Sequence, residues 1–220
     1  MTFAHRSFQE YFVARFISSC PPEVKGQLVS RFAPSVESDS VMSLLYELDS
    51  YTVEREYILP ALDTLKKRIK LVRNVGITHF LRYIKTVWRD FQVAEQERPL
   101  LIATLNDGSL YKAMWFIYER YGSEVGRNRE EPVTSLTNEE WVQRFEAEFG
   151  EGVGAPTKAM TTKMAFVRFL YGQPGHWGAQ YLRDVLATED LILERHRDAH
   201  QSLERILSSV SRRRRGMSPG

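Results

Sequence analysis

Apolar residues recur along most of this chain at intervals of three and four, which is the pattern of amphipathic α-helices. The helices predicted from this spacing cover residues 6–19, 22–33, 51–73, 77–95, 99–106, 109–121, 137–149, 157–171 and 177–211, with a further helix that carries Val41 to Leu48. Pro21 and Pro22 separate the first two helices, and Ser38 or Asp39 is expected to cap the next one. Pro60 lies inside 51–73 and is expected to kink or split that helix.

The segment between residues 100 and 120 allows two interpretations. Asn106-Asp107-Gly108 lies between two apolar runs, and an Asp-Gly pair in that position is also a hairpin signal. We favour two helices, 99–106 and 109–121, because apolar residues in the second segment repeat at intervals of three and four. A small β-hairpin near 100–120 is the alternative.

The last predicted helix, 177–211, is long and carries a coiled-coil-like seam with a polar middle. The seam consists of Leu182, Leu186, Glu189, Leu193, His196, His200, Leu203, Leu207 and Val210. Residues 122–136 are polar and contain glycine and proline, so we predict a loop and a domain boundary there. The expected fold is therefore mainly α, an irregular array of helical hairpins that ends in this long helix.

The composition is that of an ordinary globular protein. Of the 220 residues, 43% are hydrophobic and 26% are charged, which excludes a disordered chain and a disulfide-rich scaffold. Cys20 is the single cysteine and cannot form an internal disulfide, so a cytoplasmic location is expected. No window approaches 18 consecutive apolar residues, and no membrane partner is expected.

The net charge of +2 is too small to indicate a nucleic-acid partner by itself. The chain nevertheless has two basic runs, one at 66–70 and one at 212–215. Contact with RNA or DNA is a weak candidate role for Lys66, Lys67, Arg68 and Lys70. A solvated helix face is the simpler interpretation of this run.

The chain does not carry the motifs of a self-contained enzyme. Ala159 follows Lys158, whereas a P-loop needs serine or threonine after its Gly-Lys pair. His196 and His200 have a spacing that can bind zinc, but Arg197 stands where a zincin has its glutamate. We therefore assign no catalytic residue, metal site or cofactor to this chain, and we expect that alone it does not hydrolyse ATP.

One dense motif lies at the N-terminus, where residues 3–14 are Phe-Ala-His-Arg-Ser-Phe-Gln-Glu-Tyr-Phe-Val-Ala. This segment closely resembles the one that ends the winged-helix region of NACHT-type signal-transducing NTPases, the bacterial and animal relatives of NOD-like receptors. The matching residues are Phe3, His5, Ser7, Phe8, Gln9, Glu10, Tyr11, Phe12 and Ala14.

The resemblance implies roles for several of these residues. It implies that His5 contacts the phosphate of bound ADP and helps to hold a closed, inactive state. Phe3 would end a short strand, so that His5 lies at a strand-to-helix junction. Phe8, Tyr11 and Phe12 are expected to pack against the winged helix. Gln9 and Glu10 are expected to tie the start of the helix to neighbouring backbone.

The resemblance also implies a place for the chain within a larger protein. ATP or ADP with Mg²⁺ would bind the full-length parent, an ATPase, whose upstream NTPase domain would be a partner of this chain. The rest of the chain would be a non-repeat helical sensor that binds a protein trigger, in bacterial antiphage immunity a phage component, and controls homo-oligomerisation. The expected parts are 1–20, the end of the winged-helix region with the first helix; 21–125, a helical domain; 126–211, a helical sensor-like domain; and 212–220, a disordered basic tail.

Two other functions remain open from the sequence. The first is a stand-alone helical interaction module that uses the seam at 182–210 to dimerise or to bind a partner helix. The second is a helical nucleic-acid-binding protein that uses residues 66–73 and 212–215.

Overall fold

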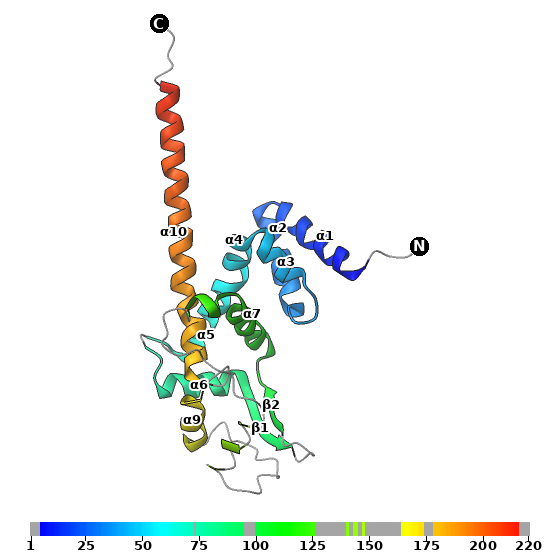
Figure 1. Ribbon diagram of the computed structural model, residues 1–220, viewed down its shortest axis with the longest axis vertical. Helices are drawn as coiled ribbons and strands as arrows, with labels where there is room; N and C mark the ends of the chain where they lie inside the picture. The colour runs from blue at the N-terminus through cyan, green and yellow to red at the C-terminus, as the bar shows by residue number, and fades with distance from the viewer. Residues whose placement is uncertain are drawn as a thin grey trace.

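The computed structural model describes residues 5–72, 74–94, 100–125, 164–173 and 178–215, and the single positions 140, 143, 144 and 147. Most of these residues are helical, and one two-stranded antiparallel sheet is present. Figure 1 shows a helical body, a sheet at one end of it and a long C-terminal helix that leaves it at the other end. The predicted class, mainly α with a long last helix, is confirmed.

The N-terminal helices follow the sequence pattern closely. They are α1 (Arg6–Ser19), α2 (Pro22–Phe32), the short 3₁₀ helix η1 (Ala33–Ser35) and α3 (Val41–Leu48). Pro22 begins α2, where its missing N–H costs no hydrogen bond. The N-cap of α3 is Ser40 instead of the predicted Ser38 or Asp39, and it makes no side-chain cap hydrogen bond. The carboxylate of the preceding Asp39 accepts a hydrogen bond from the Val41 amide at 3.0 Å.

Pro60 splits the helix predicted at 51–73. The segment consists of α4 (Ser50–Val53), a π-helical turn η2 (Glu54–Ile58) and α5 (Leu59–Ile69). Proline has no N–H for the helical ladder, and the chain widens just before it, so that the Leu59 amide donates to the Glu54 carbonyl five residues back.

The helix also ends earlier than predicted. Lys70 adopts a left-handed conformation with φ of 53°, which terminates α5. The predicted apolar stripe is confirmed at Ile58, Leu62, Leu65 and Ile69, which are fully buried. Its extension to Val72 is wrong, because Val72 lies beyond the helix and is 86% exposed.

The sheet replaces parts of two predicted helices. The helix predicted at 77–95 begins as α6 (Ile77–Val87). Its remaining residues, up to residue 94, form the strand β1 (Trp88–Ala94) instead. β1 pairs antiparallel with β2 (Leu100–Leu105), so the helix predicted at 99–106 is wrong. Short apolar runs fit strands as well as helices, and cross-strand pairing decides the outcome here.

The hairpin is therefore present, but it lies upstream of the position that the Asp-Gly pair suggested. Asp107 instead begins α7 (Gly108–Val125), since its carboxylate accepts a hydrogen bond from the Leu110 amide at 2.9 Å. The helix predicted at 109–121 is confirmed, and α7 continues through 122–125, four residues into the predicted loop. The rest of that loop lies outside the described residues.

The helices predicted in the C-terminal part of the chain are confirmed where the structure describes them. The predicted helix 157–171 appears as α9 (Met164–Tyr171), and its first residues lie outside the described ranges. Within the predicted helix 137–149, the four described positions are helical. The long helix α10 (Ala179–Arg215) has 37 residues, so positions 212–215 continue a helix instead of forming the predicted disordered tail. Residues 216–220 lie outside the description.

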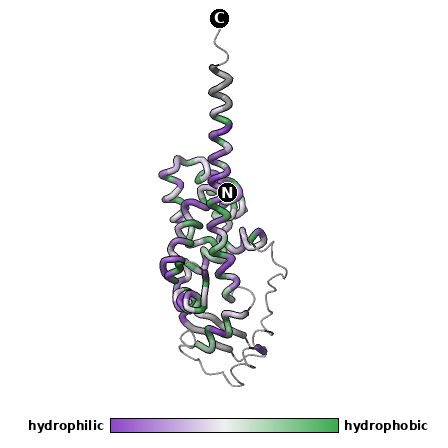
Figure 2. Tube along the Cα trace, turned by 90° about the vertical axis from the view of Figure 1, so that its left-hand side faces the viewer, coloured by the Kyte–Doolittle hydropathy of each residue, from purple (hydrophilic) through white to green (hydrophobic). Residues whose placement is uncertain are grey.

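One hydrophobic core joins helices from both halves of the chain. The largest fully buried side chains include Phe80, Tyr83, Phe116, Tyr121 and Phe166, from α6, α7 and α9. α10 adds Leu182, Leu186 and other apolar residues of its first half to the same cluster. Figure 2 shows hydrophobic positions gathered in the body, with α10 extending beyond it. The division of the chain at residue 125 stays a prediction.

Candidate functional site

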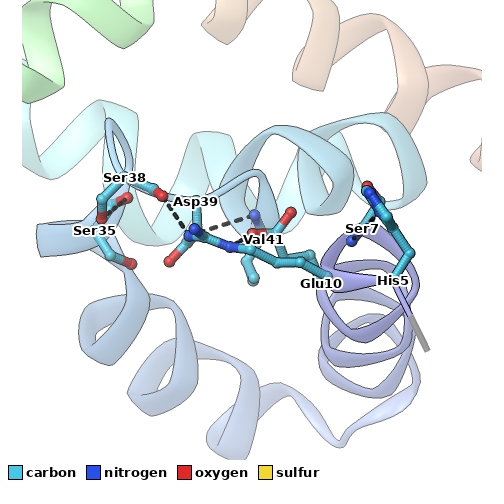
Figure 3. A network of polar contacts seen from close by, with 8 residues as sticks. His5, Ser7, Glu10, Ser35, Ser38, Asp39 and Val41 are labelled. Atoms are coloured by element: carbon cyan, nitrogen blue, oxygen red, sulfur yellow. Dashed lines mark hydrogen bonds and ion pairs between the residues drawn. The ribbon is translucent and has the colours of Figure 1, made fainter. Parts of the chain in front are cut away.

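The N-terminus of α1 is the candidate site, and His5 is its capping residue. The Ser7 amide donates to His5 Nδ1 at 3.4 Å, and the Ser7 hydroxyl lies 3.0 Å from the same nitrogen. Figure 3 shows the imidazole folded back over Ser7 at the start of the helix. Because Nδ1 accepts the amide hydrogen bond, the proton of the neutral ring is on Nε2. Nε2 is then the donor that the exposed ring can offer to a ligand.

Arg6 connects the start of α1 to the turn that precedes α3. Its guanidinium donates to the Ser38 carbonyl at 2.5 Å and to the Glu10 carboxylate at 2.8 Å. Figure 3 shows this link between the two segments. Glu10 is therefore linked to the Ser38 backbone indirectly, through the Arg6 guanidinium.

An open cavity of about 320 Å³ lies between these two segments. Its lining consists of His5, Arg6, Ser7, Glu10, Glu37, Ser38, Asp39 and Ser40. Three carboxylates face one guanidinium there, so the cavity does not attract a phosphate by its own charge. His5 can therefore serve as one donor of a phosphate site only if other groups complete that site.

The aromatic residues of the motif lie open on α1. Phe8, Phe12 and Phe16 are 60%, 64% and 61% exposed, and Tyr11 is 40% exposed. α1 contributes Ala14 and Ile17 to the core instead. The expected packing of Phe8, Tyr11 and Phe12 on a winged helix is not made by the residues described, and Phe3 lies outside them. Large adjacent aromatic side chains left in water are typical of an interaction surface.

The basic run on α5 is largely neutralised by acidic neighbours. Lys66 pairs with Glu189 on α10, and Arg68 pairs with Asp107 at the start of α7. Lys67 pairs with Asp63 one turn away at 2.5 Å. Such pairing reduces the attraction of this surface for a phosphate backbone, and the nucleic-acid role of these residues and Lys70 stays a prediction.

A buried polar cluster was not predicted from the sequence. Glu54, only 4% exposed, lies on the π-helical turn, and its carboxylate accepts a hydrogen bond from the Tyr121 hydroxyl of α7. His196 Nε2 of α10 lies 2.6 Å from the other carboxylate oxygen. The His196 ring also packs on the Tyr51 ring, with centroids 4.5 Å apart. The polar middle of the seam indicated that His196 was unusual, but no spacing rule links it to Glu54.

The Tyr121 hydroxyl is buried beside the Glu54 carboxylate. Burial raises the pKa of the Tyr121 hydroxyl, and its hydrogen bonds with Glu54 and Tyr46 raise the pKa further. The phenol therefore stays protonated and serves as a permanent donor to Glu54. Three elements, η2, α7 and α10, meet at this cluster.

The described residues contain no group of three or more His, Cys, Asp or Glu side chains arranged to hold a metal ion. His196 is bound to Glu54, and His200 lies 3.5 Å from Glu204 on the exposed part of α10. Among the same residues, every helix is too short or too polar to cross a bilayer.

These features define a helical domain with exposed aromatic side chains on its first helix and a long projecting helix at its end. Comparison with protein families matches residues 48–207 to the Short NACHT-associated C-Terminal domain, family 13. The chain belongs to this family, and it represents a C-terminal portion of a NACHT-type protein. The match begins at the last residue of α3 and includes the π turn, the sheet and most of α10. No curated protein and no solved structure matches the chain.

Proposed function

We propose that this chain is the helical sensor portion of a NACHT-type, ATP-dependent signalling switch that acts in bacterial antiphage immunity. The observation that carries the proposal is the order of two features along one chain. The motif at 3–14, which resembles the end of a NACHT winged-helix region, precedes the matched C-terminal domain at 48–207 in the same chain.

The open aromatic face of α1 supports an upstream NTPase domain as a partner. Phe8 and Phe12 lie one helical turn apart, and both are more than half exposed. Burying one large aromatic side chain contributes about 1.5–3 kcal/mol, so a winged helix packed on this face would bind it firmly. His5, one turn before Phe8, would then lie at the edge of that interface.

The capping geometry of His5 supports a role toward nucleotide. It fixes the neutral ring with Nε2 as donor, and a donor is what a phosphate oxygen of ADP requires. The remaining positive groups, the Mg²⁺ ion and the hydrolytic machinery would come from the NTPase domain. Trigger binding favours the open state only if the trigger binds that state more tightly than the closed one.

The test is ADP retention by the full-length parent carrying His5→Asn or His5→Ala. Asparagine is a strong helix cap but has no imidazole, so His5→Asn keeps the cap and removes the proposed phosphate donor. We expect both variants to release ADP on the order of tenfold faster than wild type, because each loses about one charge-assisted hydrogen bond to the phosphate. Wild-type ADP release in His5→Asn, with fast release in His5→Ala alone, would show that His5 is only a cap.

A second pair of variants tests the interdomain surface. Phe8→Ser with Phe12→Ser should leave the isolated chain folded, because both side chains are already exposed, and should activate or destabilise the full-length parent. Trp115→Ser is the matched control, since Trp115 is 40% exposed on α7. Equal effects of the two changes in the parent would contradict a specific role for α1.

A further inference from the structure

The stretch of the chain from residue 64 to residue 89 is strongly basic. It contains eight lysine and arginine residues and no aspartate or glutamate, whereas residues 37–63 contain seven acidic residues and one arginine. The eight basic residues are Lys66, Lys67, Arg68, Lys70, Arg73, Arg82, Lys85 and Arg89. The net charge of the whole chain, +2, does not reveal this separation of charge along the sequence. The basic stretch includes the second half of α5 and all of α6.

Part of this charge is neutralised on the side of α5 that faces α10. There Lys66 pairs with Glu189, and Asp190 lines the same cavity. Arg68 lies two positions further along α5, so it points to nearly the opposite side of that helix. On that side Arg68 pairs with Asp107 at the start of α7. The acidic residues of α10 and the Arg68 side chain are therefore on different sides of α5.

Three cations near the ends of α5 and α6 pair with no carboxylate of the described residues. They are Lys70, Arg82 and Lys85. Arg82 Nη1 donates to the Ile69 carbonyl at 3.2 Å, which places Arg82 beside Lys70 at the end of α5. Lys85 follows three positions after Arg82, on the same face of α6. Lys70 and Lys85 are exposed, and the opposite face of α6 is buried in the core.

The pair of Arg68 and Asp107 lies next to these cations. Asn106 Nδ2 donates to the Lys85 carbonyl at 3.2 Å, and the next residue in the chain, Asp107, pairs with Arg68. These bonds bring the end of α6 and the last turn of α5 together on one surface. We call this surface the basic patch; it consists of Arg68, Lys70, Arg82 and Lys85. It carries four positive charges against the one carboxylate that is bound to it.

We propose that the basic patch binds double-stranded nucleic acid through the phosphate backbone, without reading the base sequence. Neighbouring lysine and arginine side chains are the groups that neutralise a row of phosphates. The aromatic residues of the same stretch, Phe80, Tyr83 and Trp88, are buried and cannot stack on an unpaired base. A duplex therefore fits the patch better than a single strand. The inference goes beyond the proposed function and does not depend on the nucleotide role of His5.

The test is binding of the full 220-residue chain to a fluorescein-labelled DNA duplex of random sequence, measured by anisotropy. Each neutralised phosphate contributes about −0.9 to the slope of log affinity against log salt concentration. Three unpaired cations therefore predict about 40-fold weaker binding when NaCl is raised from about 50 to about 200 mM. An RNA duplex of the same length should bind within about threefold of the DNA, because phosphates carry the contact.

A pair of variants tests the patch itself. Lys70→Gln with Lys85→Gln removes two exposed cations and leaves Arg82 in place. Binding at about 50 mM NaCl should weaken about tenfold or more, and the same salt step should then change it only about 3.5-fold. Arg31→Gln with Arg197→Gln is the matched control, since it removes the same charge at exposed positions of α2 and α10. The control should stay within about threefold of wild type.

Several results would overturn the proposal. One is a wild-type chain that does not bind the duplex at about 50 mM NaCl, and another is an equal loss in the patch variant and the control. A loss of binding that occurs only when the four arginines at 212–215 are replaced by glutamine would assign the contact to the end of α10. Polyglutamate that competes as well as a duplex of equal charge would indicate an acidic protein as the partner instead.

Discussion

The buried cluster of Glu54, Tyr121 and His196 provides the sharpest test of how α10 is held on the body. Removing a hydrogen-bond donor from a buried carboxylate costs about 1–3 kcal/mol or more, because the carboxylate is left without that partner in a poorly solvated site. The His196 side chain is 20% exposed, so water can reach part of the site after a substitution. We therefore expect His196→Gln to lower the free energy of unfolding by about 3 kcal/mol and no more.

The same reasoning gives smaller effects for the other partner and for a control. Tyr121→Phe removes one hydrogen bond to a buried carboxylate, with an expected cost of about 1.5–3 kcal/mol. His200→Gln is the matched control, because the His200 side chain is 75% exposed, and its cost should be under about 0.5 kcal/mol.

The assay is thermal unfolding followed by calorimetry, combined as a double-mutant cycle with Glu54→Gln. For a chain of this size, 3 kcal/mol corresponds to a Tm decrease of about 6–12 °C. With Glu54→Gln no buried charge remains, so the cost of His196→Gln should fall by about 1–3 kcal/mol. Strictly additive effects, within about 0.5 kcal/mol, would refute the idea that His196 stabilises the protein through Glu54.

Two further predictions concern acid stability and the end of α5. Burial raises the pKa of Asp49 and of Asp107, but hydrogen bonds bring both pKa values down to below the ordinary 3.8. The donors to Asp49 are Lys25 and Thr52. The donors to Asp107 are Leu110 and Arg68. The stabilisation from these two carboxylates is therefore present above pH 3.8 and lost as the pH falls through the lowered values, so Asp49→Asn should flatten the acid limb of a Tm-against-pH curve. Ile69→Ala should lower the free energy of unfolding in urea by about 3 kcal/mol, because Ile69 is fully buried. Val72→Ala should lower it by under about 0.5 kcal/mol, because Val72 is exposed. Comparable losses at both positions would contradict the end of α5 at Ile69.

Much of the fold could be predicted because its signals are local. The helical spacing and the prolines at positions 21, 22 and 60 determine where the helices begin, end or split. The sheet could not be predicted in place, because 88–94 and 100–105 form strands through pairing with each other. Their apolar residues fit a helical stripe equally well until the partner is known.

The candidate site was only partly predictable for the same reason. The motif at 3–14 identifies His5 directly, but the contact between Arg6 and Ser38 depends on how α1 packs on α3. Glu54 and His196 lie 142 residues apart in sequence, and only the packing of α10 beside the π turn brings them together. The exposure of the α1 aromatic residues could not be predicted either, because their helical spacing fits a buried stripe as well as an exposed one.

Two open apolar surfaces among the described residues, one on α1 and one on the second half of α10, have separate structural supports. The aromatic face lies on α1, which is fixed by its packing on α3 and by the hydrogen bond from Arg6 to the turn before α3. The exposed segment of α10, residues 197–208, follows directly after Arg195 and His196, which contact α7 and η2. Figure 1 shows that α1 and the C-terminal half of α10 point in different directions from the body. Because neither surface contributes to the support of the other, substitutions of the exposed residues on one of them should leave the packing of the other unchanged.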